Sequence, residues 1–188
     1  MQTKKLTLGC GKDIRPATAG WVNLDSAKLP GVDIVWNIEK LPLPFKDSEF
    51  EEILANDILE HVEYIPVLKD LHRILKPGGK LTARVPHFTS KNNFADPTHK
   101  KMFSVVTFDF FVKNPIFSKP KEREYYFDFH FDRISKIHIT FEKSSRWFFY
   151  NKIVEPFINI GPKMQYFYEA TGLSREFPAE NIIVELIK

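Results

Sequence analysis

An amphipathic helix between two short apolar runs is the feature that most constrains how this chain folds. Apolar side chains recur at three- and four-residue spacing after Pro66, at Leu68, Leu71, Ile74 and Leu75. Pro66 suits a first helical turn, and Lys76-Pro77-Gly78-Gly79 ends the helix. The runs 52–55 and 80–85 flank it. A strand, a helix and a strand in this order predict a parallel βαβ unit with a right-handed crossover.

Three earlier apolar runs add strands to the same sheet. They cover residues 6–8, 21–25 and 32–36, and their length and their content of Val, Ile and Leu suit buried parallel strands. The connection between Gly11 and Asp25 is short and contains a proline and a glycine, so we expect a loop or one helical turn there.

The second half of the chain holds most of the aromatic residues, which make up 14% of the sequence and include 18 Phe. Alternation over residues 125–141 predicts an antiparallel pair of strands with one polar face, in which Phe127, Phe129 and Phe131 point toward the core. Residues 147–154 and 182–187 are two more strand candidates. The run 102–117 is too rich in apolar side chains for one helical stripe, so part of it should face a pocket, a partner or a lipid-like acceptor.

Length and composition limit the class of protein. The 188 residues suit one domain, and the net charge of +3 is too small to argue for a nucleic-acid partner. No apolar run approaches the ~20 residues that span a bilayer, so no transmembrane segment is expected. Cys10 is the one cysteine, which excludes a disulfide within the chain. With no signal-peptide pattern ahead of the first strand, we expect a reducing, cytoplasmic location.

Glycine and polar residues follow the predicted strands at their carboxyl ends, where parallel sheets bind ligands. The loop Gly9-Cys10-Gly11 lets a ligand approach the backbone, although a tight turn alone also explains a glycine pair. Asp25 ends the second strand, where a carboxylate accepts both hydroxyls of a ribose or, in the simpler alternative, caps a turn with Ser26. Ile14 stands where a dinucleotide fingerprint has its third glycine, so a cofactor without phosphates fits better.

Four segments carry a resemblance to a known family: LTLGCGK, WVNLDS, LPLPFKDSEFEEILANDILEHV and LHRILKPGGKLTARVP. Over most of residues 5–86 the chain resembles the small, type 11-like class I S-adenosylmethionine-dependent methyltransferases. The resemblance implies an α/β fold with a three-layer, Rossmann-like, seven-stranded sheet, mostly parallel with the last strand antiparallel. It also implies an aromatic-rich insertion after strand five, and looser matches at FADPTHKKMFS and PAENIIVEL agree with this.

The same resemblance implies S-adenosyl-L-methionine as the cofactor. Its binding residues are then Gly9, Cys10, Gly11, Asp25, Ser26, Asn37, Ile38, Asn56 and Asp57. Residues 1–87 become a cofactor-binding half of a single domain, residues 88–145 a substrate-side insertion or lid, and residues 146–188 the closing strands. Thr7 stands where the family often has an acid for the amino end of the cofactor, so another group must hold that ammonium. No N-terminal helix precedes the first strand, and we expect the insertion alone to roof the cleft.

Methyl transfer to a hydroxyl requires a base near pH 7, because the cofactor supplies the electrophile and the acceptor must lose a proton. We expect His87, Asp96 and His99 to be catalytic, with His99 facing the acceptor and Asp96 fixing its tautomer. In the alternative, Asp96 caps a helix and His99 bonds a backbone carbonyl. His61 is a further candidate base, but its position suits a structural role better.

No metal site is predicted from the sequence. Asp128, His130 and Asp132 share one face of a strand at a spacing that metal ligands use. No cysteine or second tight cluster accompanies them, which favours a solvated polar face. Cys10 lies in the cofactor loop, where a small side chain fits, and is not expected to be a nucleophile.

Three functions remain open at this point. The leading one is methyl transfer to a small-molecule acceptor, aromatic or partly apolar, at oxygen in preference to nitrogen or carbon. The second is methylation of RNA or protein, against which stand the low net charge and Asn56-Asp57-Ile58-Leu59 in place of an Asn-Pro-Pro-aromatic clamp. The third is a non-catalytic cofactor-binding protein, which Thr7 keeps open. A homodimer through an edge strand within residues 125–141 is also left open.

Overall fold

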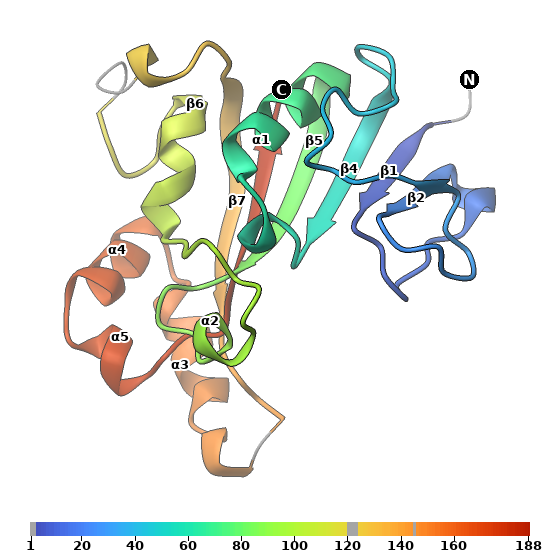
Figure 1. Cartoon of the computed structure of the whole chain (residues 1–188). Helices are drawn as coiled ribbons and strands as arrows, with labels where there is room; N and C mark the ends of the chain where they lie inside the picture. Colours follow the sequence, from blue (N-terminus) through green and yellow to red (C-terminus); the bar gives the residue numbers. More distant parts are fainter. Residues whose placement is uncertain (1–2, 120–123, 145) are drawn as a thin grey trace.

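A mixed β-sheet organises the protein (Figure 1). The computed structural model describes residues 3–119, 124–144 and 146–188, and these form an eight-stranded sheet in the order β3-β2-β1-β4-β5-β8-β7-β6. The strands are β1 (Lys5–Leu8), β2 (Trp21–Asp25), β3 (Ile34–Val35), β4 (Phe50–Asn56), β5 (Leu75–Pro86), β6 (Val112–Asn114), β7 (Phe131–Thr140) and β8 (Asn181–Ile187). Strands β1 to β5 are parallel, and β8 runs antiparallel to both β5 and β7.

The fold class predicted from the sequence is therefore confirmed, with one additional strand. The sheet is mostly parallel and its last strand is antiparallel, as expected. The eighth strand is the three-residue β6, which pairs in parallel with the start of β7. So short a strand is stabilised by tertiary pairing, and it has no periodicity of its own that a sequence pattern could show.

The first half follows its sequence pattern closely. Helix α1 (Tyr64–Ile74) lies between β4 and β5, and its apolar stripe is buried. The short connection between β1 and β2 holds a single 3₁₀ turn (Ala17–Ala19), as predicted. Strand β5 begins at Leu75, earlier than expected, because Leu75 pairs with Phe50 before a register shift in β4.

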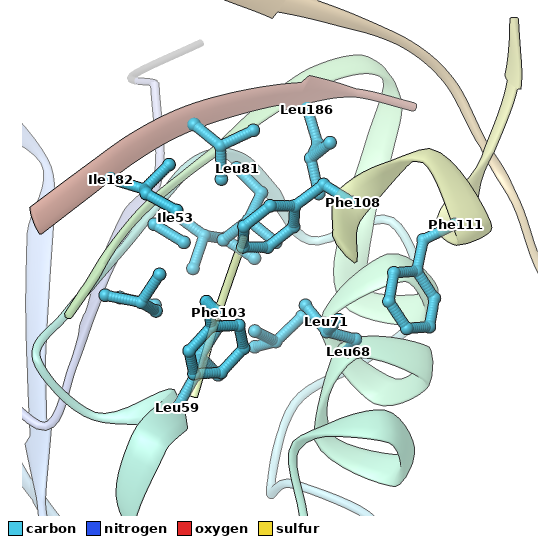
Figure 2. Close-up of a cluster of buried hydrophobic side chains, with 14 of the residues drawn as sticks. Ile53, Leu59, Leu68, Leu71, Leu81, Phe103, Phe108, Phe111, Ile182 and Leu186 are labelled. Carbon is cyan, nitrogen blue, oxygen red and sulfur yellow. The ribbon is translucent and has the colours of Figure 1, made fainter. Parts of the chain in front are cut away.

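The hydrophobic core lies between one face of the sheet, helix α1 and the 3₁₀ helix Val105–Phe111 (Figure 2). Phe103 and Phe108 stack with ring centroids 5.9 Å apart. Part of the run 102–117 was expected to face a pocket, a partner or a lipid-like acceptor. Its middle supplies much of this core, whereas Ile116 and Phe117 line a surface pocket and Met102 is exposed. Its fully or almost fully buried members are Phe103, Val105, Phe108, Phe111 and Val112. The core accommodates these crowded apolar residues because the chain changes direction within residues 102–117. Side chains on several sides of this segment therefore reach the core.

The second half differs from two of the strand predictions. Residues 125–141 do not form an antiparallel pair: Glu124–Tyr126 is a 3₁₀ turn and Phe131–Thr140 is the single strand β7. Its antiparallel partner is β8, from the end of the chain. Residues 147–154 are not a strand either, since Arg146–Phe148 is a 3₁₀ turn and α3 (Asn151–Ile158) follows. Alternation of apolar and polar residues shows sidedness, but it does not identify the partner strand.

Besides α3, three short helices complete the second half: α2 (Asn92–Ala95), α4 (Pro162–Ala170) and α5 (Leu173–Glu176). The pair α3 and α4 covers the open edge of β7. Asn159, directly after α3, hydrogen-bonds the backbone of Ile139 in β7, and Gln165 in α4 hydrogen-bonds the backbone of Ile137. These bonds are 2.7–3.0 Å long. These amides occupy the positions that another strand would use, so this part of the edge is not free to pair with a second copy. None of the helices in the described residues is long and apolar enough to cross a membrane.

Candidate functional site

The carboxylate of Asp25 lies directly against the loop after β1. Its Oδ2 accepts a hydrogen bond from the backbone N–H of Gly11 at 2.7 Å, and its Oδ1 accepts one from Ala27 at 2.8 Å. The backbone N–H of Cys10 donates to the carbonyl of Leu24, which ties the loop to the end of β2. Asp25 and the glycine loop therefore meet at the carboxyl edge of the sheet, as the sequence predicted.

The two glycines of this loop have different surroundings. Both have positive φ, +63° at Gly9 and +50° at Gly11, a conformation that favours glycine. A Cβ at Gly9 would lie 2.8 Å from the side chain of Ile58, whereas a Cβ at Gly11 would meet nothing within 4 Å. Gly9 is thus packed against the segment after β4, and Gly11 faces open space. Cys10 between them is buried, and burial raises the pKa of its thiol, which agrees with a packing role.

The segment after β3 reaches the same edge. The backbone N–H of Trp36 donates to the carbonyl of Asp25 at 2.8 Å and so places Asn37 beside the end of β2. Asn37 is exposed, and its Oδ1 accepts the N–H of Glu39. The Ile38 side chain, also expected to bind the cofactor, belongs to the buried core. Ser26 is exposed directly after Asp25.

A polar cavity of about 740 Å³ lies beyond the ends of β4 and β5. Its lining comes from the segment after β4, the end of β5, the segment 92–99 and the chain at the start of β8: Asp57, Glu60, His61, Arg84, Pro86, Asn92, Ala95, Asp96, Pro97, His99, Glu180 and Asn181. Asp57 and Arg84 in this lining form a two-bond ion pair, and Asn56 pairs with Arg84 in the β4–β5 register. We call this space the polar cavity.

His99 and Asp96, the proposed catalytic pair, both line the polar cavity. His99 Nε2 lies 3.8 Å from Asp96 Oδ2, too far for a hydrogen bond, and His99 Nδ1 has no partner among the described residues. Asp96 Oδ1 instead accepts bonds from the N–H and the hydroxyl of Thr98, which lower the pKa of that carboxyl. The structure therefore brings the pair together without the direct hydrogen bond that would fix the His99 tautomer.

Glu60 and His61 belong to the same group, although Glu60 was not singled out from the sequence. Glu60 is 1% exposed, and neither of its carboxylate oxygens has a hydrogen-bond partner in the described part of the chain. Burial raises the pKa of this carboxyl to about 7. The rings of His61 and His99 meet edge to face, with centroids 4.7 Å apart. Three titratable side chains thus meet at one wall of the polar cavity.

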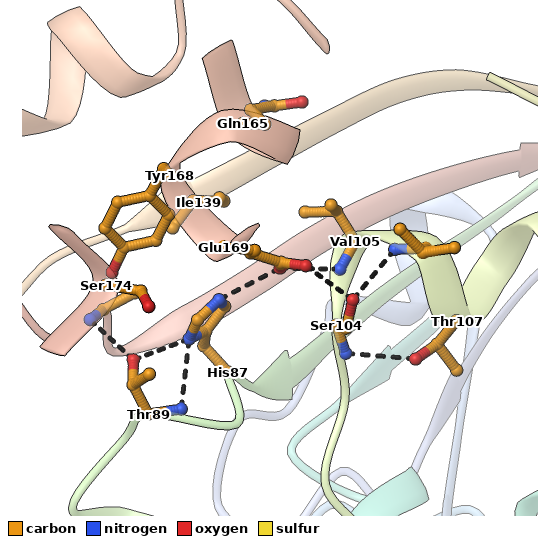
Figure 3. Close-up of polar contacts among 12 residues, drawn as sticks. His87, Thr89, Ser104, Val105, Thr107, Ile139, Gln165, Tyr168, Glu169 and Ser174 are labelled. Carbon is orange, nitrogen blue, oxygen red and sulfur yellow. Dashed lines mark hydrogen bonds and ion pairs between the residues drawn. The ribbon is translucent and has the colours of Figure 1, made fainter. Parts of the chain in front are cut away.

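His87, the third expected catalytic residue, lies elsewhere (Figure 3). It is fully buried and does not line the polar cavity. Its Nδ1 bonds Thr89 at 2.7 Å and its Nε2 bonds Glu169 of α4 at 3.0 Å. Glu169 also accepts bonds from the hydroxyl of Ser104 and the N–H of Val105. His87 therefore joins β5 to α4 and the 3₁₀ helix, and its geometry suits a structural role.

The two carboxylates of the face at 128–132 are exposed to solvent, whereas Nε2 of His130 is buried without a hydrogen-bond partner in the described residues. Asp128 forms an ion pair with Lys69 at 2.5 Å, and Asp132 pairs with the neighbouring Arg133. The described residues do not gather Asp128, His130 and Asp132 into a ligand cluster.

Comparisons with known proteins agree with the fold described above. Residues 6–83 match the family model Methyltransf_11, a methyltransferase domain. An uncharacterized protein of Methanocaldococcus jannaschii (MJ0638) is 34% identical over 89 residues, which cover 43% of this chain and 40% of that protein. The chain thus corresponds to less than half of the curated relative's length.

Solved structures share the fold over nearly the whole chain. A SAM-dependent methyltransferase of Archaeoglobus fulgidus has a TM-score of 0.59 at 17% identity, covering 99% of this chain and 86% of its own. A possible histamine N-methyltransferase of Thermotoga maritima has a TM-score of 0.55 at 15% identity, covering 100% and 83%. At these identities the likeness concerns the fold alone. The chain therefore resembles the S-adenosylmethionine-dependent methyltransferases in the domain matched over residues 6–83 and in its fold. This likeness implies S-adenosylmethionine as the cofactor.

The residues of this methyltransferase domain fit that cofactor. Gly11 leaves open space beside the Asp25 carboxylate, as a nucleoside bound to the carboxylate requires. Thr7, in place of the family acid, is 3% exposed, and its hydroxyl has no hydrogen-bond partner in residues 3–119 or the other described ranges. A buried hydroxyl of this kind is available to a polar group of a ligand.

Proposed function

We propose that this protein transfers the methyl group of S-adenosylmethionine to a hydroxyl of a small, polar molecule bound in the polar cavity. The observation that supports this most is a wall shared by the cofactor loop and the cavity. Ile58 packs against Gly9, and its neighbours Asp57 and Glu60 line the cavity. A molecule in the cavity therefore lies next to the cofactor loop, as in-line transfer requires.

The lining of the cavity favours a polar acceptor. Apart from the imidazoles of His61 and His99, its described lining contains no aromatic side chain, and most of its side chains are charged or carry amides. The expectation of an aromatic or partly apolar acceptor came from the run 102–117, whose residues do not line this cavity. A volume of about 740 Å³ suits a small molecule.

Each residue of the site has a definite part in this proposal. When bound, S-adenosylmethionine supplies a methyl group on a sulfonium, ready for displacement by an acceptor oxygen. Asp25 holds the sugar of the cofactor, and the loop Gly9-Cys10-Gly11 holds the cofactor atoms that face its backbone. Ser26, Asn37, Asn56 and Asp57 lie around them. His99 accepts the acceptor's proton at its free Nδ1, and Asp96 is a positioning residue. His87 supports the scaffold.

The test uses a donor labelled with ¹³C in the methyl group and a set of small polyols, sugars and hydroxy acids. Carbon chemical shifts separate O-methyl from N-methyl and C-methyl products in one spectrum. We expect an O-methyl product that the wild-type protein forms and that Asp25→Asn and His99→Ala do not. Asp13→Asn, which removes an exposed carboxylate of the same loop, is the control and should retain activity.

Each other result has a definite meaning. An N-methyl or C-methyl product overturns the choice of a hydroxyl acceptor. Label found on RNA or protein, with salt-sensitive transfer, favours the macromolecular acceptor. Unchanged turnover in His99→Ala with normal cofactor binding removes His99 from catalysis.

A further inference from the structure

Glu60, His61 and His99 form a tight cluster at one wall of the polar cavity. Each offers one ligand atom, and these atoms all lie within 4.8 Å of one another. Glu60 and His61 belong to the 3₁₀ turn after β4, and His99 comes from the segment after α2. The backbone N–H groups of Lys100 and Lys101 both donate to the Glu60 carbonyl, at 2.8 and 3.2 Å. These bonds hold His99 close to the turn.

The polar atoms of the cluster lack partners inside the protein. The Glu60 carboxylate is buried and neither oxygen accepts a hydrogen bond from the described residues, and the same holds for His99 Nδ1. A buried carboxylate without partners is unfavourable unless it takes up a proton or pairs with a cation. Glu60 therefore provides an observation, independent of the spacing, that favours a cation at this wall of the cavity.

The third member, His61, is oriented by a chain of hydrogen bonds. The Thr98 hydroxyl donates to Asp96 Oδ1 at 2.6 Å, so its oxygen accepts from His61 Nδ1, which lies 2.8 Å away. This assigns the proton to Nδ1 and leaves Nε2 with a free lone pair. Histidines that bind metals are oriented in this way, with the second nitrogen donating to an outer polar group.

The charges around the cluster also favour a cation. Four carboxylates line the polar cavity, on Asp57, Glu60, Asp96 and Glu180. The guanidinium of Arg84 lines it too but is already paired with Asp57. The ammonium groups of Lys100 and Lys101 pair with Glu39 and Glu63, which lie outside the lining.

We propose that Glu60, His61 and His99 bind a divalent first-row transition metal cation such as Zn²⁺. Two imidazoles and one carboxylate suit such a cation, whereas Ca²⁺ and Mg²⁺ prefer oxygen ligands alone. Three protein ligands leave a position open toward the cavity. A hydroxyl bound there would lose its proton more readily, as a zinc-bound water does. With the cation bound, His99 would hold it as a ligand and the proton would pass to solvent, whereas without the cation His99 is the base. This use of the cation rests on the proposed function, but its binding does not.

The test is a titration of the tag-free, chelator-treated protein with Zn²⁺, without S-adenosylmethionine, followed by calorimetry. We expect one site per chain with micromolar or tighter affinity. Glu60→Gln, His61→Gln and His99→Gln should each weaken binding more than Thr98→Val, which removes an outer partner and should cost about 10- to 100-fold. The matched controls are Glu63→Gln and His130→Gln, whose side chains lie outside the cavity lining and should change nothing.

A second readout keeps the result clear if a variant folds poorly. Co²⁺ bound to the wild type should give a visible absorption band that Zn²⁺ displaces, and each variant is first checked for binding of S-adenosylhomocysteine. Normal S-adenosylhomocysteine binding without a Zn²⁺ site overturns the metal proposal alone. Equal Zn²⁺ affinity in Glu60→Gln and Glu63→Gln also overturns it. If the wild type does not bind S-adenosylhomocysteine, this result counts against the proposed function and does not affect the metal proposal.

Discussion

The two ends of the proposed site differ in how far their polar groups are already satisfied. At the cofactor end, both oxygens of Asp25 accept backbone N–H bonds from Gly11 and Ala27. At the polar cavity, the Glu60 carboxylate and His99 Nδ1 have no partners in the described residues. At the cofactor end the Asp25 carboxylate is therefore held by the protein itself and the Thr7 hydroxyl is left without a partner, whereas at the cavity end a carboxylate and an imidazole nitrogen are left without one in the described residues.

The two ends also differ in how the chain builds them. The cofactor end is local, since the loop after β1 and the end of β2 are neighbours in the parallel sheet. The cavity end depends on long-range docking, in which residues 88–103 are held against β5 and the core. Phe88 donates its N–H to the Phe103 carbonyl at 2.8 Å, and His87 bridges to Glu169. Four predictions separate local from long-range construction.

The largest effect is expected at Phe103, which anchors the second half in the core. Its side chain is fully buried and stacks on Phe108. Phe103→Ala should lower the free energy of unfolding by about 3–5 kcal/mol, measured by urea denaturation. Met102→Ala is the control, because Met102 is 57% exposed and should cost less than about 0.5 kcal/mol. Similar losses for both variants would show that residues 102–103 do not anchor the second half.

The next effect separates two histidines by role. His87→Ala should cost about 3 kcal/mol of unfolding free energy, because it empties a fully buried site and removes the buried hydrogen bonds to Glu169 and Thr89. His99→Ala should cost less than about 1 kcal/mol, since the His99 ring makes no close hydrogen bond, but it should reduce turnover. The reverse order of stability losses would contradict the assignment of His87 to the scaffold.

A smaller effect concerns the two glycines of the cofactor loop. Gly9→Ala combines a positive φ with a 2.8 Å approach to Ile58, whereas Gly11→Ala has the positive φ alone. We expect losses of about 2 and about 1 kcal/mol in unfolding free energy. Thermal denaturation of both variants measures the difference. A greater loss at Gly11 would mean that Ile58 does not support the loop.

The smallest effect is a pH dependence at the contact between the halves. His72 on α1 packs against Phe129 and Phe131, and burial lowers its pKa to about 4, aided by Lys188, Lys113 and His130 nearby. Between about pH 6.5 and 4 the unfolded chain binds a proton that the folded one resists, so stability falls as pH falls.

We expect this loss to amount to about 1 kcal/mol, less than the full shift implies because the ring is half-exposed and solvent screens its charge. Urea denaturation at pH 7 and pH 5 measures it in the wild type. His72→Gln should show a smaller loss over the same interval, because glutamine does not titrate. An equal loss in both proteins would place the pH dependence in other groups.

The sequence predicted the strands and the meeting of Asp25 with the glycine loop well, because the signals for them are local. Apolar runs, the helix stop at Lys76-Pro77-Gly78-Gly79 and the position of Asp25 at a strand end each depend on a few adjacent residues. The parallel order of the strands then brings Asp25 to Gly11 without further information.

The cavity end could be predicted only in part, because its residues come together through tertiary packing. Asp96 and His99 were identified from their own short segment, but Glu60 and Thr98 were not. The glutamate stands in an apolar segment, and nothing local shows that its carboxylate is buried and faces His99. Residues 125–141 were misread for a similar reason, since the partner of β7 lies at the end of the chain.

Calorimetric titration with S-adenosylhomocysteine tests the central claim, that Asp25 and the glycine loop hold the cofactor's nucleoside. We predict one site per chain in the wild type and in Asp13→Asn. Asp25→Asn should bind about 10- to 150-fold more weakly, because it removes a charged hydrogen-bond acceptor worth about 1.5–3 kcal/mol. No binding by the wild type, or equal affinity in Asp25→Asn, would contradict the account.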